Sequence, residues 1–449
     1  MTISILPDDV LLHIFYSVRL EADRLRPLTV TWWHRFVHVC RRWRSIIFES
    51  PNSLNLRIVC APRTRTELLG IWPPLPIIIT NTIDPHMPDY PFEAAIVHRN
   101  RVCEIDLYLQ KSRLQLLASA MREQFPALIH LELAAFYDTR PALALPDSFL
   151  GGSAPHLRSL KLNRISFPAL PNLLLSATKL VCLYLWDIPD SGYISPEAIV
   201  TGLAALANLE SLTIEFKFSP FFPDRGRRHP LQSTRTVLPA LTYFEFQGAC
   251  RYSEDLMARI DAPLLDTIYI TFRQSTFNIP ELAKFMRRTA RFQAFNEAHV
   301  NFDYEGVLVQ SLPLTQLNEI SRLRIICEDI DWDPSSLAQI LISLFPSIYI
   351  VEYLYIYGTG YMEWADNIES MQWLEIFHPF TAVKKLYISH EFAEYIAPAL
   401  QELVRDRATD VLPALEHLFL ENLKISDLFQ RQLLGHSVAV SHWVRLDGI

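Results

Sequence analysis

The feature that most constrains the fold is a short apolar phrase, L-x-x-L-x-L, which returns twelve times between Val102 and Leu420. In a strand, successive side chains point to opposite faces, so the last two apolar residues of each phrase predict a short strand with one buried face. The phrases recur at a mean interval of about 28 residues, with helix-compatible segments between them. The sequence therefore predicts a repeating strand–helix architecture of the α/β class.

One copy of the phrase is degraded, because Phe292 and Phe295 are followed by Glu297 at the third apolar position. The central apolar residues of the phrases are Ile105, Leu131, Leu160, Leu183, Leu212, Phe244, Ile268, Phe295, Leu323, Leu354, Leu386 and Leu418. The pattern resembles leucine-rich repeats. It departs from them where the usual Asn or Cys is replaced, as by Ile165 and Ile188. The resemblance implies an irregular solenoid with long repeats.

The first fifty residues carry a second pattern, typical of two or three short helices. Asp8 and Asp9 are placed to cap the first helix and to face the positive end of its dipole. Two apolar faces recur at helical spacing, Leu11, Ile14, Phe15 and Val18, then Phe36, Cys40, Trp43 and Ile47, and Pro51 ends the second. Because so short a segment buries little core alone, we expect it to pack on a neighbour or to keep apolar surface for a partner.

These residues resemble the F-box over residues 1–58. The resemblance rests on two blocks in order: Leu6, Pro7, Asp8, Asp9, Ile14 and Phe15, then Val39, Cys40, Arg42, Trp43, Arg44, Ser50 and Pro51. It implies helices that bind a Skp-type adaptor, which is joined to a cullin scaffold and a RING subunit. It assigns adaptor-contacting or module-core roles to Leu6, Pro7, Leu11, Ile14, Phe15, Val39 and Trp43. The sequence departs from the family at Leu54, where a Trp is common.

The two patterns predict four segments. Residues 1–58 form the helical F-box module, and residues 59–95 form a Pro-rich connector with a short strand at 77–80. Residues 96–436 form the leucine-rich-repeat-like solenoid, and residues 437–449 form a C-terminal cap or tail. The predicted fold class is therefore α/β, a helical F-box followed by an irregular leucine-rich-repeat-like solenoid.

The repeat geometry also predicts an exposed row of residues, one between the two closing apolar positions of each phrase. In chain order the row reads Asp106, Glu132, Lys161, Tyr184, Thr213, Glu245, Tyr269, Asn296, Arg324, Tyr355, Tyr387 and Phe419. Tyr353 and Tyr357 flank its late end. Neighbouring strands lie about 4.8 Å apart, so these rings can form one aromatic strip.

Exposed tyrosines favour protein recognition, because each ring gives a large contact area for little rotamer entropy. The candidate target-binding residues are therefore Tyr353, Tyr355, Tyr357, Tyr387 and Phe419. The alternative is that tyrosine favours strands and that a C-terminal segment covers the strip.

Composition bears on partners and compartment. The net charge is -8, and a mildly acidic chain argues against a nucleic-acid partner. Six cysteines without a C-x-x-C pair suggest neither a zinc site nor a disulfide framework. The most membrane-like window, residues 337–357, is interrupted by Pro346 and Glu352. We expect no membrane contact, no cofactor, no metal and a cytoplasmic or nuclear location.

Catalytic and metal-binding patterns are incomplete. Asp329, Asp331 and Asp333 imitate the start of an EF-hand loop, but Pro334 stands where the turn needs Gly. His34 and His38 have the spacing of a metal pair but lie inside the F-box-like segment, where a helix-surface or partner-contact role is expected. The basic stretch at residues 224–230 is expected to be a solvated insertion.

The sequence thus predicts a non-catalytic protein, the substrate-recognition subunit of a Skp–cullin–F-box ubiquitin ligase with an unknown protein target. The alternative is a leucine-rich-repeat scaffold that binds protein partners without ubiquitination.

Overall fold

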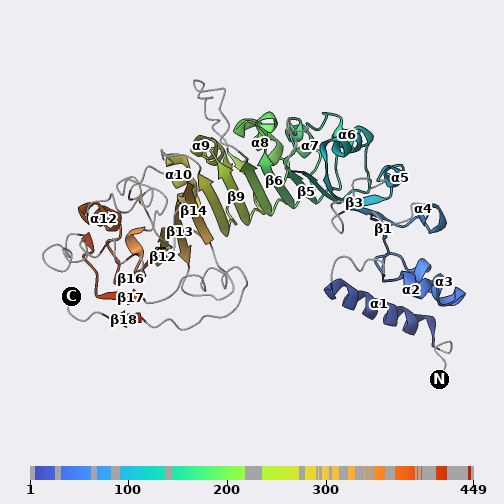
Figure 1. The fold of residues 1–449 in the computed structure, drawn as a ribbon, viewed down its shortest axis with the longest axis horizontal. Coiled ribbons are helices and arrows are strands. Elements are labelled where there is room, and N and C mark those ends of the chain that lie inside the picture. The colour runs from blue at the N-terminus through green and yellow to red at the C-terminus, as the bar shows by residue number, and fades with distance from the viewer. Residues whose placement is uncertain are drawn as a thin grey trace. The chain divides into compact units, whose positions relative to one another are not determined.

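The protein is described by a computed structural model in which the chain divides into two compact units, Met1–Tyr193 and Ile194–Ile449 (Figure 1). The residues described are 6–25, 32–61, 68–81, 92–136, 144–217, 235–272, 279–289, 292, 296–302, 306–312, 322–328, 338, 342, 348–358, 370–389, 392, 396, 411–421 and 443–445. Among these residues, none of the helices combines the length and the apolar character that a membrane crossing requires.

The first unit begins with three helices, α1 (Asp8–Leu25), α2 (His34–Val37) and α3 (Arg41–Glu49). The predicted second helical region is therefore split. Cys40 adopts an extended conformation as the N-cap of α3, and its Sγ accepts a hydrogen bond from the Trp43 N–H at 3.5 Å. This cap replaces one of the backbone partners that a helix start lacks. Cys40 consequently belongs to the turn between two helices and not to one continuous face.

A parallel sheet follows in the first unit, with the strand order β1-β2-β3-β4-β5-β6. The strands are β1 (Ile58–Cys60), β2 (Ile77–Thr80), β3 (Val102–Leu109), β4 (His130–Ala135), β5 (Ser159–Asn163) and β6 (Cys182–Ile188). The connecting helices are α4 (Leu68–Ile71), α5 (Glu93–Ile96), α6 (Lys111–Ala120) and α7 (Leu170–Leu174), with 3-10 turns at Phe149–Gly152 and Asp190–Gly192. The strand predicted at 77–80 is present, and it joins this sheet together with β1.

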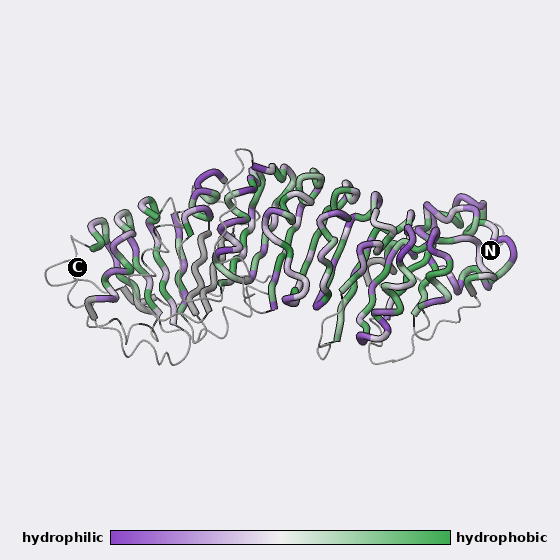
Figure 2. Tube along the Cα trace, turned by 90° about the horizontal axis from the view of Figure 1, so that it is seen from above, coloured by the Kyte–Doolittle hydropathy of each residue, from purple (hydrophilic) through white to green (hydrophobic). Residues whose placement is uncertain are grey.

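The core of the first unit is built from the apolar phrases. Leu131 and Leu133 of β4 are buried, as are Leu160 and Leu162 of β5, while the residues between them are only partly buried. This alternation is the one that a half-buried strand requires. The helices α6 and α7 lie along one side of the strands (Figure 1), and apolar residues recur along each strand (Figure 2).

The second unit repeats the strand–helix pattern. Its strands are β7 (Ser211–Phe216), β8 (Thr236–Val237), β9 (Tyr243–Gly248), β10 (Ile260–Asp261), β11 (Thr267–Phe272), β12 (Glu297–Phe302), β13 (Gly306–Leu312), β14 (Arg322–Glu328), β15 (Tyr353–Gly358), β16 (Lys385–Ser389), β17 (His417–Glu421) and β18 (Trp443–Arg445). Its helices are α8 (Pro196–Leu203), α9 (Cys250–Met257), α10 (Pro280–Arg288) and α12 (Ser370–Phe377), with a 3-10 turn at Ile348–Ile350. The predicted α/β class with an N-terminal helical module is confirmed.

The order of strands in the second unit differs from a simple succession of repeats. It runs β7-β9-β11-β14-β13-β12-β15-β16-β17-β18. β13 is antiparallel to both β12 and β14, so three consecutive strands form a meander, and β14 rather than β12 pairs with β11. β18 adds an antiparallel strand beside β17, within the segment predicted as a cap or tail.

The degraded phrase is placed differently from the prediction. β12 begins at Glu297, and its buried apolar residues are Ala298, Val300 and Phe302. Glu297 therefore lies on the opposite face from the core, and His299, not Asn296, occupies the predicted exposed row. The weak apolar phrase around Phe292 gave a register that is wrong by three residues, from Asn296 to His299. A shift by an odd number of residues exchanges the two faces of a strand.

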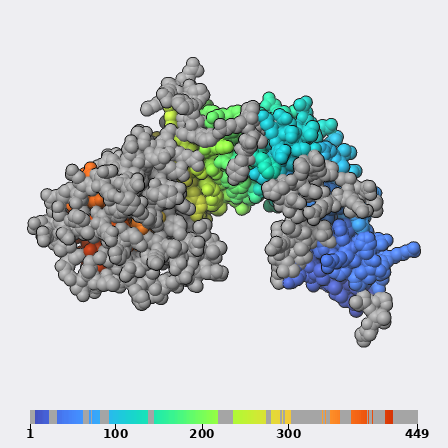
Figure 3. Space-filling view, viewed as in Figure 1, coloured from blue at the N-terminus to red at the C-terminus, as the bar shows by residue number. Residues whose placement is uncertain are grey.

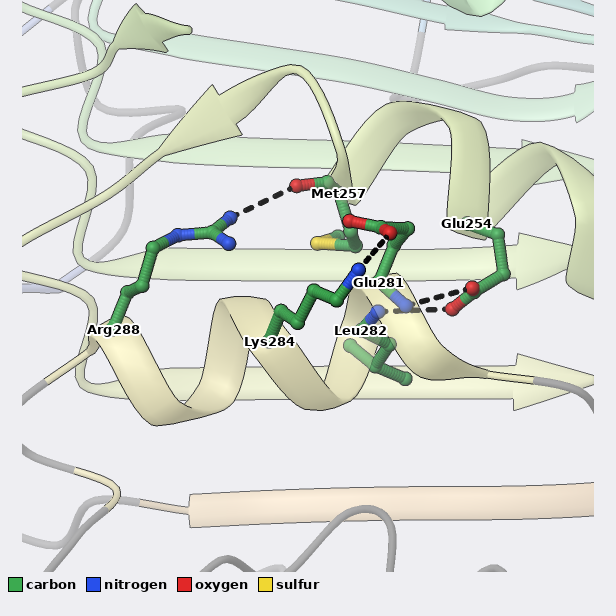
Figure 4. Close-up of polar contacts among 6 residues, drawn as sticks. All are labelled: Glu254, Met257, Glu281, Leu282, Lys284 and Arg288. Carbon is green, nitrogen blue, oxygen red and sulfur yellow. Dashed lines mark hydrogen bonds and ion pairs between the residues drawn. The ribbon is translucent and has the colours of Figure 1, made fainter. Parts of the chain in front are cut away.

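Polar contacts join neighbouring repeats in the second unit (Figure 4). The carboxylate of Glu254 on α9 accepts hydrogen bonds from the Glu281 N–H at 2.8 Å and the Leu282 N–H at 2.9 Å, at the start of α10. At the other end of α10, Arg288 donates to Asp261 at 2.7 Å and to the Met257 carbonyl at 3.2 Å. Both ends of α10 are thus tied to the preceding repeat.

Candidate functional site

Two surfaces carry the residues singled out in the sequence, and the first is the N-terminal helical module. Its interior is aromatic. Leu11 and Phe15 are buried, and the Phe15 ring lies 5.1 Å from the Trp43 ring and 5.4 Å from the Phe36 ring, between centroids. Leu11, Phe15 and Trp43 therefore hold α1 against α2 and α3.

The start of α1 is fixed by Arg42 from α3. The Arg42 guanidinium donates to Asp8 Oδ1 at 2.8 Å and to the Leu6 carbonyl at 2.5 Å. Asp8, predicted as a helix cap, thus forms an ion pair across the module. This contact orders the residues around Leu6 and Pro7, which lead into the helix.

The outer surface of the module is apolar at several positions. Ile14 is 42% exposed and Val39 is 58% exposed, and Pro7, which precedes α1, is exposed as well. Three more exposed apolar residues of α1 were not singled out in the sequence, namely Val10, Tyr16 and Leu20. Val10 and Ile14 are spaced i, i+4, as are Tyr16 and Leu20, and this spacing was the signal that could have found them. Figure 3 shows the described atoms of the module in blue.

Leu54 marks the departure from the F-box pattern, and the structure shows what it does. It is fully buried, and its N–H donates to the Ser50 carbonyl at 3.1 Å in the turn that follows α3. Leu54, which is smaller than the Trp common at this position in the F-box family, therefore occupies a core position at the C-terminal edge of the module.

His34 and His38 do not form a metal site with a third ligand among the described residues. The His34 ring stacks on Trp72 at 5.7 Å, and Trp72 also contacts Trp33 at 5.2 Å. Burial, together with the neighbouring His38, lowers the pKa of His34. Trp33 Nε1 donates to the Arg57 carbonyl at 3.2 Å, so this aromatic cluster joins the helices to the start of the sheet.

The second surface is the sheet face opposite the core. In the first unit the backbone register places Asp106, Glu132, Lys161 and Tyr184 side by side, as predicted. Lys161 Nζ lies 3.0 Å from Glu132 and 5.6 Å from the Tyr184 ring centroid. The charges of this part of the row are therefore partly paired within the chain.

In the second unit the row begins with Thr213, which is buried and not exposed as predicted. The Thr213 hydroxyl donates to Glu245 at 3.3 Å, and the Tyr243 hydroxyl donates to the same carboxylate at 2.8 Å. Glu245 and Tyr269 follow in register, as predicted.

The late end of the row is an aromatic ladder, which we define as His299, Tyr355, Tyr387 and Phe419. These residues are direct partners on the parallel strands β12, β15, β16 and β17. Successive ring centroids are 4.4, 4.3 and 4.6 Å apart, with interplanar angles of 5°, 7° and 9°. The predicted strip is therefore a continuous stack, and His299 is the member that the sequence did not reveal.

All four ladder residues are partly exposed, which leaves them available for contact. Tyr357 stacks near His299 at 5.9 Å, and Lys385 Nζ lies 5.3 Å from the ring centroid of Tyr353. Burial raises the pKa of Tyr355, and the nearby Glu297 carboxylate adds to the rise. Tyr355 thus stays a neutral hydrogen-bonding phenol at physiological pH.

Several sequence candidates lie outside the described residues, namely Asp329, Asp331, Asp333 and the basic stretch at 224–230. Of the cysteines that the structure describes in full, Cys60, Cys103 and Cys250 are buried, Cys182 is partly buried and Cys40 is exposed. The described thiols form no disulfide.

Comparison with known proteins gives one family match, in which residues 3–54 fit the family described as F-box-like. A search among curated proteins gives no match. Among solved structures, the leucine-rich repeat-containing protein LegL7 from Legionella pneumophila is similar at a TM-score of 0.33 and 13% identity, covering 79% of this chain and 97% of that chain. The chain thus carries an F-box-like domain at residues 3–54, and this domain supports binding of a Skp-type adaptor. The repeated strand–helix units that follow it are shown by the sheet topology itself.

Proposed function

We propose that this protein is the substrate-recognition subunit of a Skp–cullin–F-box ubiquitin ligase. The observation that carries the proposal is the F-box-like domain at residues 3–54, joined to repeats with a partly exposed aromatic ladder. The helical module binds the Skp-type adaptor, and through it the cullin, while the repeat surface binds the target protein.

The adaptor-binding residues divide into two groups by exposure. Pro7, Ile14 and Val39 are exposed and provide contact area, together with Val10 and Leu20. Leu11 and Phe15 support this surface from inside the module, and the partly buried Trp43 packs on Phe15. Exposed apolar side chains on so small a module favour a protein partner, because a partner removes them from water.

The target-binding residues are Tyr353, Tyr355, Tyr357, Tyr387 and Phe419, with His299 added by the ladder. Rings held in a stack lose little conformational freedom when a partner binds, which favours affinity. The protein acts by tethering: it raises the effective concentration of target lysines near the loaded conjugating enzyme, and the transfer chemistry belongs to other subunits.

Adaptor binding is tested by co-purification of the full chain with a Skp-type adaptor. Ile14→Asp and Val39→Asp each place a charge on the outer surface of the module and are expected to abolish or strongly weaken co-purification. Leu116→Asp is the matched control, because Leu116 is 52% exposed on α6, outside the module. Wild-type protein that fails to retain the adaptor, or module variants that retain it as well as the control does, would contradict the proposal and favour the scaffold alternative.

A further inference from the structure

Basic side chains gather at the edge where strands of the first unit begin. Arg158 directly precedes β5, and its N–H donates to the Ile129 carbonyl, just before β4, at 2.8 Å. His130 opens β4 and pairs in register with Ser159, so Lys161 lies two residues further along β5 on the same face of the sheet. His130, Arg158 and Lys161 are therefore neighbours at the amino ends of two adjacent strands.

A fourth basic side chain, Arg57, reaches the same place from the turn before β1. Its guanidinium pairs with the carboxylate of Glu104 on β3, and Glu104 is the register partner of His130. Partial shielding from water lowers the pKa of His130, and the nearby Arg57, Arg158 and Lys161 lower it further. His130 is thus a neutral imidazole with one N–H donor at physiological pH. We call Arg57, His130, Arg158 and Lys161 the basic cluster.

The basic cluster is open to solvent and has a small excess of positive charge. His130 and Arg158 are exposed, and Lys161 is partly exposed. The three permanent cations of the cluster lie beside two carboxylates, Glu104 and Glu132, of which Glu132 lies 3.0 Å from Lys161 Nζ. Three cations less two carboxylates leave one positive charge, so a single negative charge from a partner neutralises the cluster.

We propose that the basic cluster binds the carboxylate of an aspartate or glutamate side chain of the target protein. The inference rests on the proposed function, because it gives the target a second contact on the repeat sheet. The forked N–H donors of the Arg158 guanidinium match the two oxygens of a carboxylate, and the His130 imidazole adds a further N–H. Lys161 and Arg57 contribute through their charge.

The next row of the same sheet face disfavours a chain of phosphates. Asp106 and Glu132 are register partners two residues further along β3 and β4. A nucleic-acid backbone would bring repeated negative charges against these carboxylates, and like charges at close range are unfavourable. One acidic side chain that enters at the amino ends of the strands avoids this row. The charge pattern therefore favours an acidic protein segment over a nucleic acid.

The test begins with a displayed library of random peptides, which is selected on the full chain in its wild-type form and as Arg158→Glu. Wild type is expected to enrich Asp and Glu, and the charge reversal is expected to abolish that enrichment. An enriched peptide is then synthesised, and its binding is measured by fluorescence anisotropy at low salt. Replacing its acidic residue by the matching amide is expected to weaken binding about fivefold, as the loss of an exposed ion pair does.

Arg158→Gln is expected to weaken the acidic peptide by the same factor and to leave the amide form of the peptide unchanged. High salt is expected to reduce the difference. Arg122→Gln is the matched control, because Arg122 is exposed in the turn after α6 and lies outside the basic cluster. Melting temperatures establish that each variant is folded.

The inference is overturned if selection enriches no acidic residues, if Arg158→Gln weakens both forms of the peptide alike, or if Arg122→Gln has the same effect as Arg158→Gln. A phosphoserine at the acidic position that binds more than about tenfold tighter would assign the cluster to phosphate instead. A single strand of about ten nucleotides that competes with the peptide would assign it to nucleic acid.

Tyr387→Ala separates failure of this inference from failure of the proposed function. If the enriched peptides are not acidic but lose binding in Tyr387→Ala, the repeat surface binds targets and only the basic cluster is wrong. If no peptide is enriched at all, both the inference and the assignment of target binding to the repeat surface fail.

Discussion

Phe15 is the residue on which the helical module depends most directly. Its ring is fully buried and packs on both Phe36 and Trp43. Phe15→Ala removes these contacts and leaves a cavity, so it is expected to lower the free energy of unfolding by about 3–5 kcal/mol. Urea denaturation followed by tryptophan fluorescence measures this loss. Ile14→Ala, at the exposed neighbouring position, is the control, and an equal loss for both variants would show that Phe15 is not in the core.

His34 makes the junction between helices and sheet sensitive to acid. Because its pKa in the folded protein lies below the unfolded value of 6.5, the unfolded chain binds a proton more readily than the folded one does. Stability is therefore full above the unfolded pKa and falls as the pH drops through 6.5 towards the folded pKa. We expect the melting temperature to fall between about pH 7.5 and pH 5.5, across the ordinary range of histidine titration.

The variant His34→Gln removes this titration and is expected to flatten the acid side of the stability profile. His13→Gln is the matched control, since His13 is exposed on α1. If the slope with pH is the same in wild type and in His34→Gln, the acid sensitivity belongs to another group.

At the scale of single residues, the sequence predicted the place of a residue in the exposed row better than it predicted whether that residue is buried. Tyr355, Tyr387 and Phe419 were placed on one row because their phrases are strongly apolar. His299 was missed because its own phrase is weak, so that its register could not be read. Thr213 was assigned to the exposed row by alternation, but it is buried, and its hydroxyl donates to the Glu245 carboxylate on the neighbouring strand.

Among the elements, α10 is positioned by Glu254 from the preceding helix. The carboxylate accepts the two N–H groups at the start of α10, which have no partner within the helix itself. Burial raises the pKa of Glu254, and the two N–H groups oppose that rise. Glu254→Ala leaves both donors without this partner and is expected to cost about 0.5–2 kcal/mol, as the loss of a helix cap does.

Differential scanning calorimetry of the full chain measures the effect. Asp255→Ala is the control, because Asp255 is the adjacent carboxylate on α9 and is exposed. A melting temperature that falls equally in both variants would mean that the loss reflects helix charge and not the capping contact.

Most strands were predictable because each repeats the same local phrase, and the local phrase determines both the strand and its buried face. The meander β12–β13–β14 was not predictable for the opposite reason. β13 has no copy of the phrase, and its antiparallel pairing places β14 rather than β12 beside β11. Strand order is a long-range property, so a regular spacing along the chain does not determine it. The boundaries proposed for the four segments stay predictions.

For the molecule as a whole, the proposed function requires two binding surfaces, one for the adaptor and one for the target. The exposed apolar face of the helical module belongs to the first unit and the aromatic ladder to the second, so a change in one is expected to leave binding at the other intact. Ile14→Asp should abolish adaptor binding and keep target binding, whereas Tyr387→Ala should do the reverse. Co-purification with adaptor and target from the same cells measures both. Loss of both functions in either variant, with the fold preserved, would contradict separate surfaces.

The most direct test of the central claim is the turnover of the proteins that the repeat surface binds. Proximity labelling identifies them, and pulse-chase measurement gives their half-lives in cells that express wild type, Ile14→Asp or Tyr387→Ala. We expect a set of these proteins to be degraded faster with wild type and either variant to restore the longer half-life, although Ile14→Asp still binds them. Proteins that bind to the ladder but show the same half-life with wild type and with Ile14→Asp would contradict delivery to a ligase and support a scaffold without ubiquitination.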